Sequence, residues 1–312
     1  MNATPTRDGF GTELVALGRE RKDIVVVSAD LEDATRAEFF KKEFPERFFS
    51  LGIAEQDMVG TAVGFSLQGY TVFANSFAVF MTNRAYDMIR IDVCQNDANV
   101  KIVCSHAGIT VGEDGATAQC LEDLALMRVL PNMTVLCPVD VHEAKKATRW
   151  MAEHYGPCYM RTSRSAVPVI TKETDPFVVG KANVVREGAD ATIIACGLMV
   201  SEGLKAADLL KKEGIEVRVV NMHTIKPLDA DMVVESAQKT GAIVTAEEHQ
   251  IIGGLGSAVC EVLAQRHPVA VEMIGMQDAY GETGDPEGLL RKYHMKDVDI
   301  AQAVKRATKR KA

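Results

Sequence analysis

Short apolar runs alternate with longer amphipathic stretches over the first half of the chain. The runs that we predict to be strands are IVVVSA (24–29), TVFAN (71–75), VKIVCS (100–105), MTVLCP (133–138) and PCYMR (157–161). The stretches between them, such as 55–69 and 141–154, have the period of helices. Continuous apolar strands separated by helices predict a parallel sheet that is covered on both faces.

The alternation breaks at residues 164–190, whose prolines and charges indicate a short β excursion and a linker. It then resumes with predicted strands at 191–196, 216–221, 242–247 and 269–274, and helices near 200–213, 229–239, 255–265 and 297–310. The pattern predicts an α/β fold with two doubly wound domains and mostly parallel sheets. We place the first domain at residues 1–165, the linker at 166–190 and the C-terminal domain at 191–312.

Composition narrows the class of protein. A length of 312 residues suits two ordinary domains. The net charge of -8 argues against nonspecific binding to nucleic acid or anionic membrane, but it permits anionic substrates in a locally basic pocket. The seven cysteines form no CxxC pair, which favours a reducing compartment over disulfides or a zinc site. The start of the sequence lacks the apolar stretch of a signal peptide, so we expect a cytoplasmic protein.

Two segments could bind a flat heterocycle. Glu55 precedes an apolar helix, where its carboxyl group would be partly desolvated and could exchange a proton near neutrality. The alternative is an ordinary acidic residue favoured at a helix N-terminus. Phe77 and Phe80 lie three apart just before a helix and could offer their rings to one ligand, although such pairs usually belong to the core.

The segment 104–119 follows a predicted strand, where α/β folds place ligand sites. It gathers His106, Glu113, Asp114 and Thr117 among glycines. Either a substrate-facing loop or an ordinary polar loop would explain this composition.

Arg161 and Arg164 follow the next predicted strand along the chain. Guanidinium groups there suit a phosphate or sulfonate, with surface ion pairs as the alternative. The glycines of IIGGLGSA (251–258) lack the spacing and the acidic partner of a dinucleotide site, so we expect a tight turn that opens a helix.

Together these segments, in this order, resemble the pyrimidine-binding and C-terminal domains of transketolase. The resemblance rests on GIAEQDM, NSFAVF, SHAGITVGEDG and EEH…GGLGSA, and it covers essentially the whole chain. It implies the C-terminal subunit of a split transketolase, an enzyme of carbohydrate metabolism such as the pentose phosphate pathway. Such an enzyme moves a two-carbon ketol unit from a ketose or ketose phosphate to an aldose through thiamine diphosphate.

The resemblance also implies roles for individual residues around the cofactor. In the family, a glutamate at the position of Glu55 bonds N1′ of the aminopyrimidine and drives removal of the proton from thiazolium C2. Phe77 and Phe80 match the phenylalanines that stack on the ring, and Asp30 matches an aspartate beside the cofactor.

The same resemblance implies a substrate site. His106, which we expect to be catalytic together with Glu55, and Asp114 match contacts to substrate hydroxyl groups. Arg7 and Arg164 match arginines that hold the sugar phosphate.

Three positions depart from the family pattern. Ala118 stands where a histidine usually reaches the first hydroxyl of the donor, and Asn83-Arg84 stands where many transketolases have a third aromatic residue. Ala34 replaces a serine that often helps to bind phosphate, with Thr35 as a substitute. Ala118 and Ala34 motivate the hypothesis of a donor or acceptor other than a common phosphorylated sugar.

The family binds Mg²⁺ and diphosphate through a GDG motif, which this sequence lacks. Diphosphate needs that metal and a helix N-terminus. We therefore expect Mg²⁺ (or Ca²⁺) to be bound mainly by an N-terminal transketolase subunit, without metal ligands from this chain, in an α2β2 heterotetramer that is inactive without this partner. Two alternatives stay open: the beta subunit of a 2-oxo-acid dehydrogenase decarboxylase component, and a noncatalytic paralogue.

Overall fold

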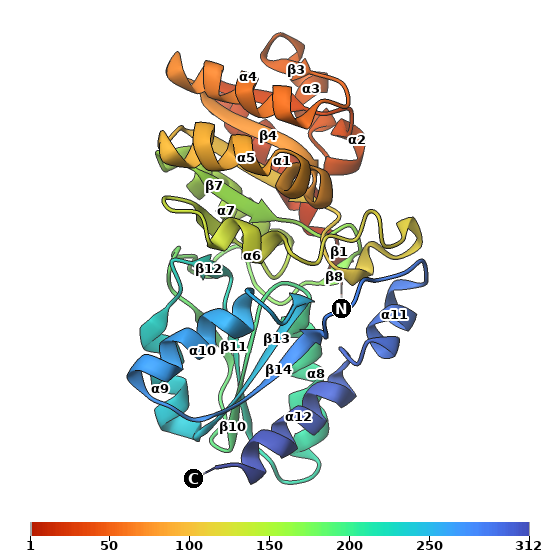
Figure 1. Ribbon diagram of the computed structural model, residues 1–312, viewed down its shortest axis with the longest axis vertical. Helices are drawn as coiled ribbons and strands as arrows, with labels where there is room; N and C mark the ends of the chain where they lie inside the picture. The colour runs from red at the N-terminus through yellow and green to blue at the C-terminus, as the bar shows by residue number, and fades with distance from the viewer. Residues whose placement is uncertain (1, 312) are drawn as a thin grey trace.

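The apolar runs form two sheets, one in each half of the molecule, stacked along its long axis (Figure 1). The structure is a computed structural model that describes residues 2–311. The strands are β1 (Ala3–Thr4), β2 (Ile24–Ser28), β3 (Phe48–Ser50), β4 (Thr71–Phe77), β5 (Val100–Ser105), β6 (Thr134–Leu136), β7 (Cys158–Arg161), β8 (Val167–Pro168), β9 (Asn183–Arg186), β10 (Ala191–Ala195), β11 (Val217–Asn221), β12 (Thr224–Lys226), β13 (Ala242–Gln250) and β14 (Ala270–Met276).

Helices connect most of these strands. The α-helices are α1 (Thr6–Glu20), α2 (Glu32–Thr35), α3 (Glu38–Glu43), α4 (Glu55–Leu67), α5 (Tyr86–Met88), α6 (Asp123–Arg128), α7 (Val141–Glu153), α8 (Met199–Lys211), α9 (Ala230–Thr240), α10 (Leu255–Arg266), α11 (Pro286–Lys292) and α12 (Asp297–Lys309). Two π-helical segments, η2 (Phe80–Arg84) and η3 (Ile89–Gln95), and two 3-10 segments, η1 (Pro45–Arg47) and η4 (Ile109–Asp114), complete the structure.

Parallel pairing dominates both sheets. The first sheet has the order β12-β6-β7-β5-β4-β2-β3, and the second has the order β14-β13-β10-β11-β9. Only β12 in the first sheet and β9 in the second pair antiparallel with their neighbours, while β1 and β8 form a separate antiparallel pair. The predicted fold class, α/β with two doubly wound and mostly parallel sheets, is confirmed.

Helices cover both faces of each sheet, and each of these helices packs an apolar stripe of side chains against the sheet. In the first half, α1 packs on α3 and α7, with Phe10 and Met151 in their shared core. The opposite face is covered by α4, through Met58 and Val59. In the second half, α8 packs on α12, and α9 packs on α10. No helix within residues 2–311 has the length and apolar character needed to cross a membrane.

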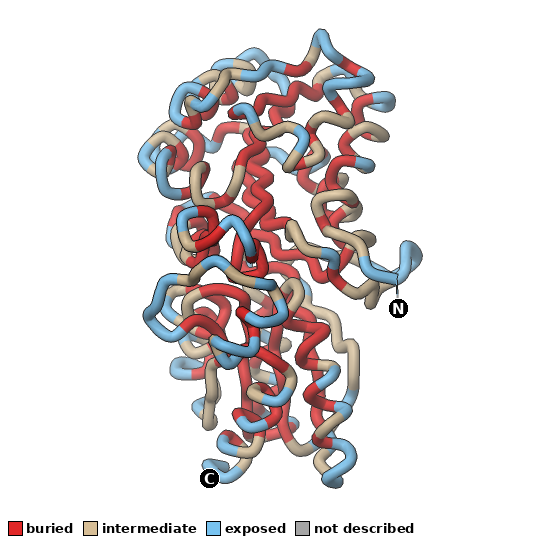
Figure 2. Tube along the Cα trace, turned by 90° about the vertical axis from the view of Figure 1, so that its right-hand side faces the viewer, coloured by how far each residue is buried: buried red, intermediate tan, exposed pale blue. Residues whose placement is uncertain are grey.

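One apolar core and one strand join the two halves. Cys137 and Tyr159 from the first half share a buried cluster with Val220 and Leu255 from the second. In addition, β12 leaves the second half of the sequence and pairs with β6 at the edge of the first sheet. Figure 2 shows the buried residues running through the interior of both halves, with exposed residues on the outer loops. The C-terminal half therefore extends the first sheet and shares its core.

Asp140 fixes the start of α7 and the connection between the halves. Its Oδ1 caps the helix by accepting a hydrogen bond from the backbone N–H of Glu143 at 3.1 Å. Its Oδ2 accepts hydrogen bonds from the backbone N–H groups of Ile170 at 2.8 Å and Thr171 at 2.6 Å. One buried carboxylate therefore stabilises a helix N-terminus and holds the following connection against it.

Glu143 makes the contact between the halves sensitive to pH. Its Oε1 accepts a hydrogen bond from Nδ2 of Asn221, on β11, at 2.7 Å. Burial raises the pKa of Glu143 to about 7, above the ordinary value of 4.5. Between these values the unfolded chain releases a proton that the folded chain keeps, so the free energy of unfolding falls as the pH rises from about 4.5 to about 7.

We predict that Glu143→Gln changes the free energy of unfolding more favourably at pH 8 than at pH 4.5. The difference between the two changes should be up to about 3 kcal/mol. The glutamine side chain cannot ionise. Its amide N–H can donate a hydrogen bond to Asn221 after the amide group of Asn221 rotates by about 180°. Urea unfolding of both proteins at the two pH values measures the difference. Glu153→Gln, on the exposed end of α7, is the control and should show no such trend. An effect of Glu143→Gln that is constant with pH would contradict the prediction.

Candidate active site

Five neighbouring strands bring the predicted site residues to one edge of the first sheet. Asp30 follows β2, Glu55 follows β3, Phe77 ends β4, His106 follows β5 and Arg164 follows β7. The carboxyl ends of parallel strands lie at the same edge of a sheet, where α/β folds place ligand sites. Residues far apart in the sequence therefore share one site.

Glu55 is the first residue of α4 and is only 1% exposed. Its Oε2 accepts a hydrogen bond from Nη1 of Arg84 at 2.9 Å. Its Oε1 is buried and has no hydrogen-bond partner within the described part of the chain. An unsatisfied oxygen on a buried carboxylate is costly, so this atom is suited to accept a donor from a ligand.

Three flat side chains lie almost parallel at the same edge of the sheet, and Arg84, which bonds Glu55, lies over one of them, Phe80. The ring centroid of Phe77 is 5.8 Å from that of Phe80 and 3.7 Å from that of His106, with interplanar angles of 14° and 13°. Phe80 begins the π-helical segment η2, whereas the sequence had placed it just before a helix. Parallel rings near an unpaired carboxylate oxygen suit a planar heterocycle that carries a proton on a ring nitrogen.

His106 is a buried and neutral imidazole. Its backbone has a φ of 58°, a left-handed conformation that is uncommon for a residue other than glycine. Nδ1 lies 2.9 Å from Oγ of Ser105, and Nε2 lies 4.0 Å from Oδ2 of Asp114. Burial, followed by the charges of Arg7 and Arg164, lowers the pKa of His106 to about 3. The ring therefore exchanges hydrogen bonds near pH 7 without carrying charge.

The C-terminal half braces the loop that follows β5. Glu248, in β13, accepts a hydrogen bond from the backbone N–H of Thr110 at 2.6 Å. Gly108 makes this approach possible, because its φ is 88° and a Cβ there would lie 2.3 Å from Oε1 of Glu248. Nε2 of Gln119 also donates to the backbone carbonyl of Glu282 at 2.8 Å. The loop is therefore fixed by residues from another domain.

Positive charge gathers beside the imidazole. Burial lowers the pKa of Arg7, and the nearby charges of Arg36 and Arg164 lower it further. Its Nη1 donates to the backbone carbonyl of Ala34 at 2.6 Å, and its buried Nε has no partner among residues 2–311. Arg164 pairs with Glu113, with Nη1 and Oε2 2.9 Å apart. This cluster suits an anionic group on a substrate.

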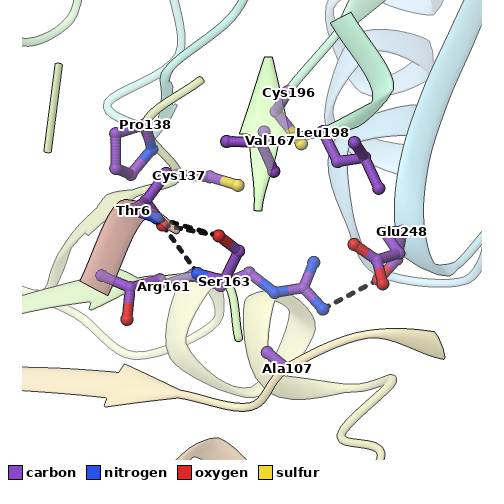
Figure 3. A pocket seen from close by; sticks show the side chains of 12 residues that line it. Thr6, Ala107, Cys137, Pro138, Arg161, Ser163, Val167, Cys196, Leu198 and Glu248 are labelled. Carbon is purple, nitrogen blue, oxygen red and sulfur yellow. Dashed lines mark hydrogen bonds between the residues drawn. The ribbon is translucent and has the colours of Figure 1, made fainter. Parts of the chain in front are cut away.

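Arg161 does not join this cluster. It is buried between the halves, where Nε lies 3.3 Å from Oδ2 of Asp123 and Nη2 donates to the backbone carbonyl of Glu248 at 2.8 Å. Burial would lower the pKa of Arg161, but Asp123 raises it above the ordinary value. Figure 3 shows this guanidinium beside a cavity of about 20 Å³, room for about one water. Both interpretations offered by the sequence, an anion site and a surface ion pair, are wrong for Arg161.

The positions that depart from the family pattern have defined surroundings. Ala118 is 8% exposed. Thr35 is buried and donates its hydroxyl to the backbone carbonyl of Leu31 at 2.9 Å, which leaves it poorly placed to replace a phosphate-binding serine. Asn83 donates to Glu122 at 2.7 Å. Among the described residues, no group of three or more His, Cys, Asp or Glu side chains is placed to hold a metal ion.

The sequence did not assign roles to Arg84, Arg36 or Glu248. Arg84 had one signal, its place in the family pattern, but the structure was needed to show its contact with Glu55. Glu248 also had a signal, its place in the EEH motif, whereas Arg36 reaches the site only through tertiary contacts, which no local pattern reveals. The glycines of 251–258 do open α10, as predicted.

Two protein-family models match the chain. They are "Transketolase, pyrimidine binding domain" over residues 2–169 and "Transketolase, C-terminal domain" over residues 180–300. The chain belongs to the transketolase family. The candidate residues at the edge of the first sheet all lie within residues 2–169, the span of the pyrimidine-binding domain match.

Relatives within the transketolase family cover almost the whole chain. A protein of Methanocaldococcus jannaschii named "Putative transketolase C-terminal section" is 44% identical, over 96% of this chain and 94% of its own. The 6-deoxy-6-sulfo-D-fructose transketolase subunit SqwH of Clostridium sp. (strain MSTE9) is 39% identical, over 98% and 95%. A solved structure described as "Split gene transketolase, inactive beta4 tetramer" is 47% identical, covers 99% of both chains and has a TM-score of 0.93.

We predict that the imidazole of His106 stays neutral from pH 8 down to pH 5. Burial and the neighbouring arginines hold its pKa near 3, well below this range. The ¹⁵N and ¹³C chemical shifts of the His106 ring, assigned by comparison with a His106→Asn variant, measure the protonation state. A titration midpoint near the ordinary value of 6.5 would contradict the assignment of a neutral ring.

Proposed function

We propose that this chain is the C-terminal subunit of a heteromeric transketolase. It would transfer a two-carbon ketol unit from a ketose or ketose phosphate to an aldose, and only together with an N-terminal partner subunit. The observation that carries the proposal is the buried, unpartnered Oε1 of Glu55 at the same sheet edge as the parallel rings of Phe77 and Phe80, to which Arg84 links it. We divide the chain into a pyrimidine-binding domain at 1–165, a linker at 166–190 and a C-terminal domain at 191–312.

The residues at this edge fit the aminopyrimidine of thiamine diphosphate. Phe77 and Phe80 would pack against the ring, and the exposed Asp30, at the end of β2, would lie beside it. When bound, thiamine diphosphate supplies the carbon nucleophile that attacks the ketose carbonyl. Glu55 would hold a proton between its Oε1 and the ring nitrogen N1′, and its burial keeps competing water away from this bond.

The neighbouring polar residues suit a sugar with an anionic group. The neutral imidazole of His106 and the carboxylate of Asp114 would orient hydroxyl groups of the substrate, with His106 also taking part in catalysis. Arg7 and Arg164 would pair with a phosphate or sulfonate. The name of the SqwH relative includes a sulfonated sugar, which supports an anionic substrate of this kind. Ala118 keeps a donor other than a common sugar phosphate within the proposal.

Two observations support a partner subunit. The 47% identical solved structure is a split-gene transketolase in the form of an inactive β4 tetramer. In addition, Ile53, just before α4, and Leu67, the last residue of α4, are each 75% exposed, and Gly60 and Gly64 of α4 have open space where a Cβ would be. Glycine inside a helix costs roughly 1 kcal/mol relative to alanine, which favours a close neighbour of α4 at these glycines.

We propose an α2β2 heterotetramer in which Mg²⁺ (or Ca²⁺) is bound mainly by the N-terminal subunit, which also binds the diphosphate. The seven cysteines, Cys94, Cys104, Cys120, Cys137, Cys158, Cys196 and Cys260, are all free. Unpaired thiols support a reducing, cytoplasmic setting for this assembly.

We predict that the chain, mixed with its N-terminal partner, thiamine diphosphate and Mg²⁺, transfers ketol units and that Glu55→Gln lowers the rate by at least about 100-fold, the usual contribution of a proton-transfer group. Gln keeps the size of the side chain but cannot take a proton. The assay uses phosphorylated, sulfonated and neutral ketoses.

Glu153→Gln, the same substitution at an exposed position of α7, is the matched control and should keep the wild-type rate. Decarboxylation of a 2-oxo acid in place of ketol transfer, or wild-type activity in the Glu55 variant, would contradict the proposal.

A further inference from the structure

Arg84 reaches the proposed catalytic carboxylate from the rim of the site. Its Nη1 donates to Oε2 of Glu55 at 2.9 Å. The side chain of Arg84 is 51% exposed, whereas that of Glu55 is 1% exposed. An arginine at the surface therefore supports a negative charge in the interior, where an unpaired carboxylate would be strongly disfavoured.

Arg84 is itself fixed by two neighbours. Its Cζ lies 5.0 Å from the ring centroid of Phe80, within the range of a cation–π contact. Its backbone carbonyl accepts a hydrogen bond from Nε2 of Gln56 at 3.1 Å. Gln56 follows Glu55 in α4, and Phe80 begins η2, so Arg84 joins the start of α4 to the aromatic segment.

The contact between Arg84 and Glu55 uses only one carboxylate oxygen. A guanidinium can hold both oxygens of a carboxylate in paired bonds. Here Oε1 stays without a partner among all residues that the structure describes. The arrangement balances the charge of Glu55 and still leaves one acceptor atom open.

We propose that Arg84 is a positioning residue that holds Oε2 of Glu55 so that Oε1 faces N1′ of the aminopyrimidine. The proposal rests on the proposed function, since it assigns the open oxygen to that cofactor. Arg84 fixes the rotamer of Glu55, and its packing on Phe80 sets the distance between the carboxylate and the rings of Phe77 and Phe80.

The first test uses the full chain alone, without cofactor or partner. Melting temperatures are compared for wild type, Arg84→Met, Glu55→Gln and the double variant. We expect Arg84→Met to lower the melting temperature, because it leaves a buried carboxylate unpaired, and to have a much smaller effect when Glu55 is already Gln. Equal effects of Arg84→Met in both backgrounds would overturn the proposed coupling.

The second test uses the assembled complex and measures hydrogen–deuterium exchange at C2 of thiamine diphosphate. Arg84→Met should slow exchange by about tenfold or more, the effect of losing a hydrogen bond to a charged group. Arg84→Lys should recover most of the rate, because the contact needs a single donor. Arg90→Met removes an exposed arginine that pairs only loosely with Asp87, at 3.7 Å, and should leave exchange unchanged.

The outcomes separate this inference from the proposed function. Exchange as fast in Arg84→Met as in wild type, or no recovery in Arg84→Lys, would overturn the positioning role. A wild-type complex that binds the cofactor but shows no exchange would instead reject the proposed function. The melting-temperature coupling between Arg84→Met and Glu55→Gln, measured on the free chain, would still decide whether Arg84 stabilises the buried Glu55 side chain.

Discussion

A buried carboxylate with one paired and one open oxygen is the interaction on which the rest of the site depends. Arg84 donates a hydrogen bond to one oxygen of the buried Glu55 carboxylate, and the other oxygen has no partner within residues 2–311. The fold supplies the setting. The short strand β3 ends at the site edge, and α4 begins with Glu55 itself, so the carboxylate is placed by two rigid elements.

The C-terminal half contributes to this edge although its candidate site residues are few. Glu248 bonds the loop after β5, and Arg161 pairs with Asp123 while it bonds the backbone of Glu248. These are buried charged contacts, which lose much of their value when either side shifts. Thr110, which bonds Glu248, follows His106 in the same loop, and the His106 ring lies 3.7 Å from that of Phe77 between centroids. The second domain is therefore part of the architecture of the site and not only an attached module.

The sequence predicted those features that repeat along the chain. β5 appears at Val100–Ser105, as the apolar run indicates, and α4 and α7 begin at the predicted residues. It did not predict β12, because three residues are too few to show a period and their partner strand is far away in sequence. The sequence also did not predict the contact of Arg84 with Glu55 or the burial of Arg161. Both arise from tertiary packing, which decides whether a charged side chain faces a ligand or another residue.

This chain, we propose, supplies the pyrimidine half of a thiamine diphosphate site that another subunit completes. Calorimetric titration of thiamine diphosphate with Mg²⁺ into this chain, into the N-terminal subunit and into their mixture tests the proposal. We expect the mixture to bind the cofactor far more tightly than either chain alone, because only the mixture has both halves of the site. Equally tight binding by this chain alone, or no gain on mixing, would contradict the proposal.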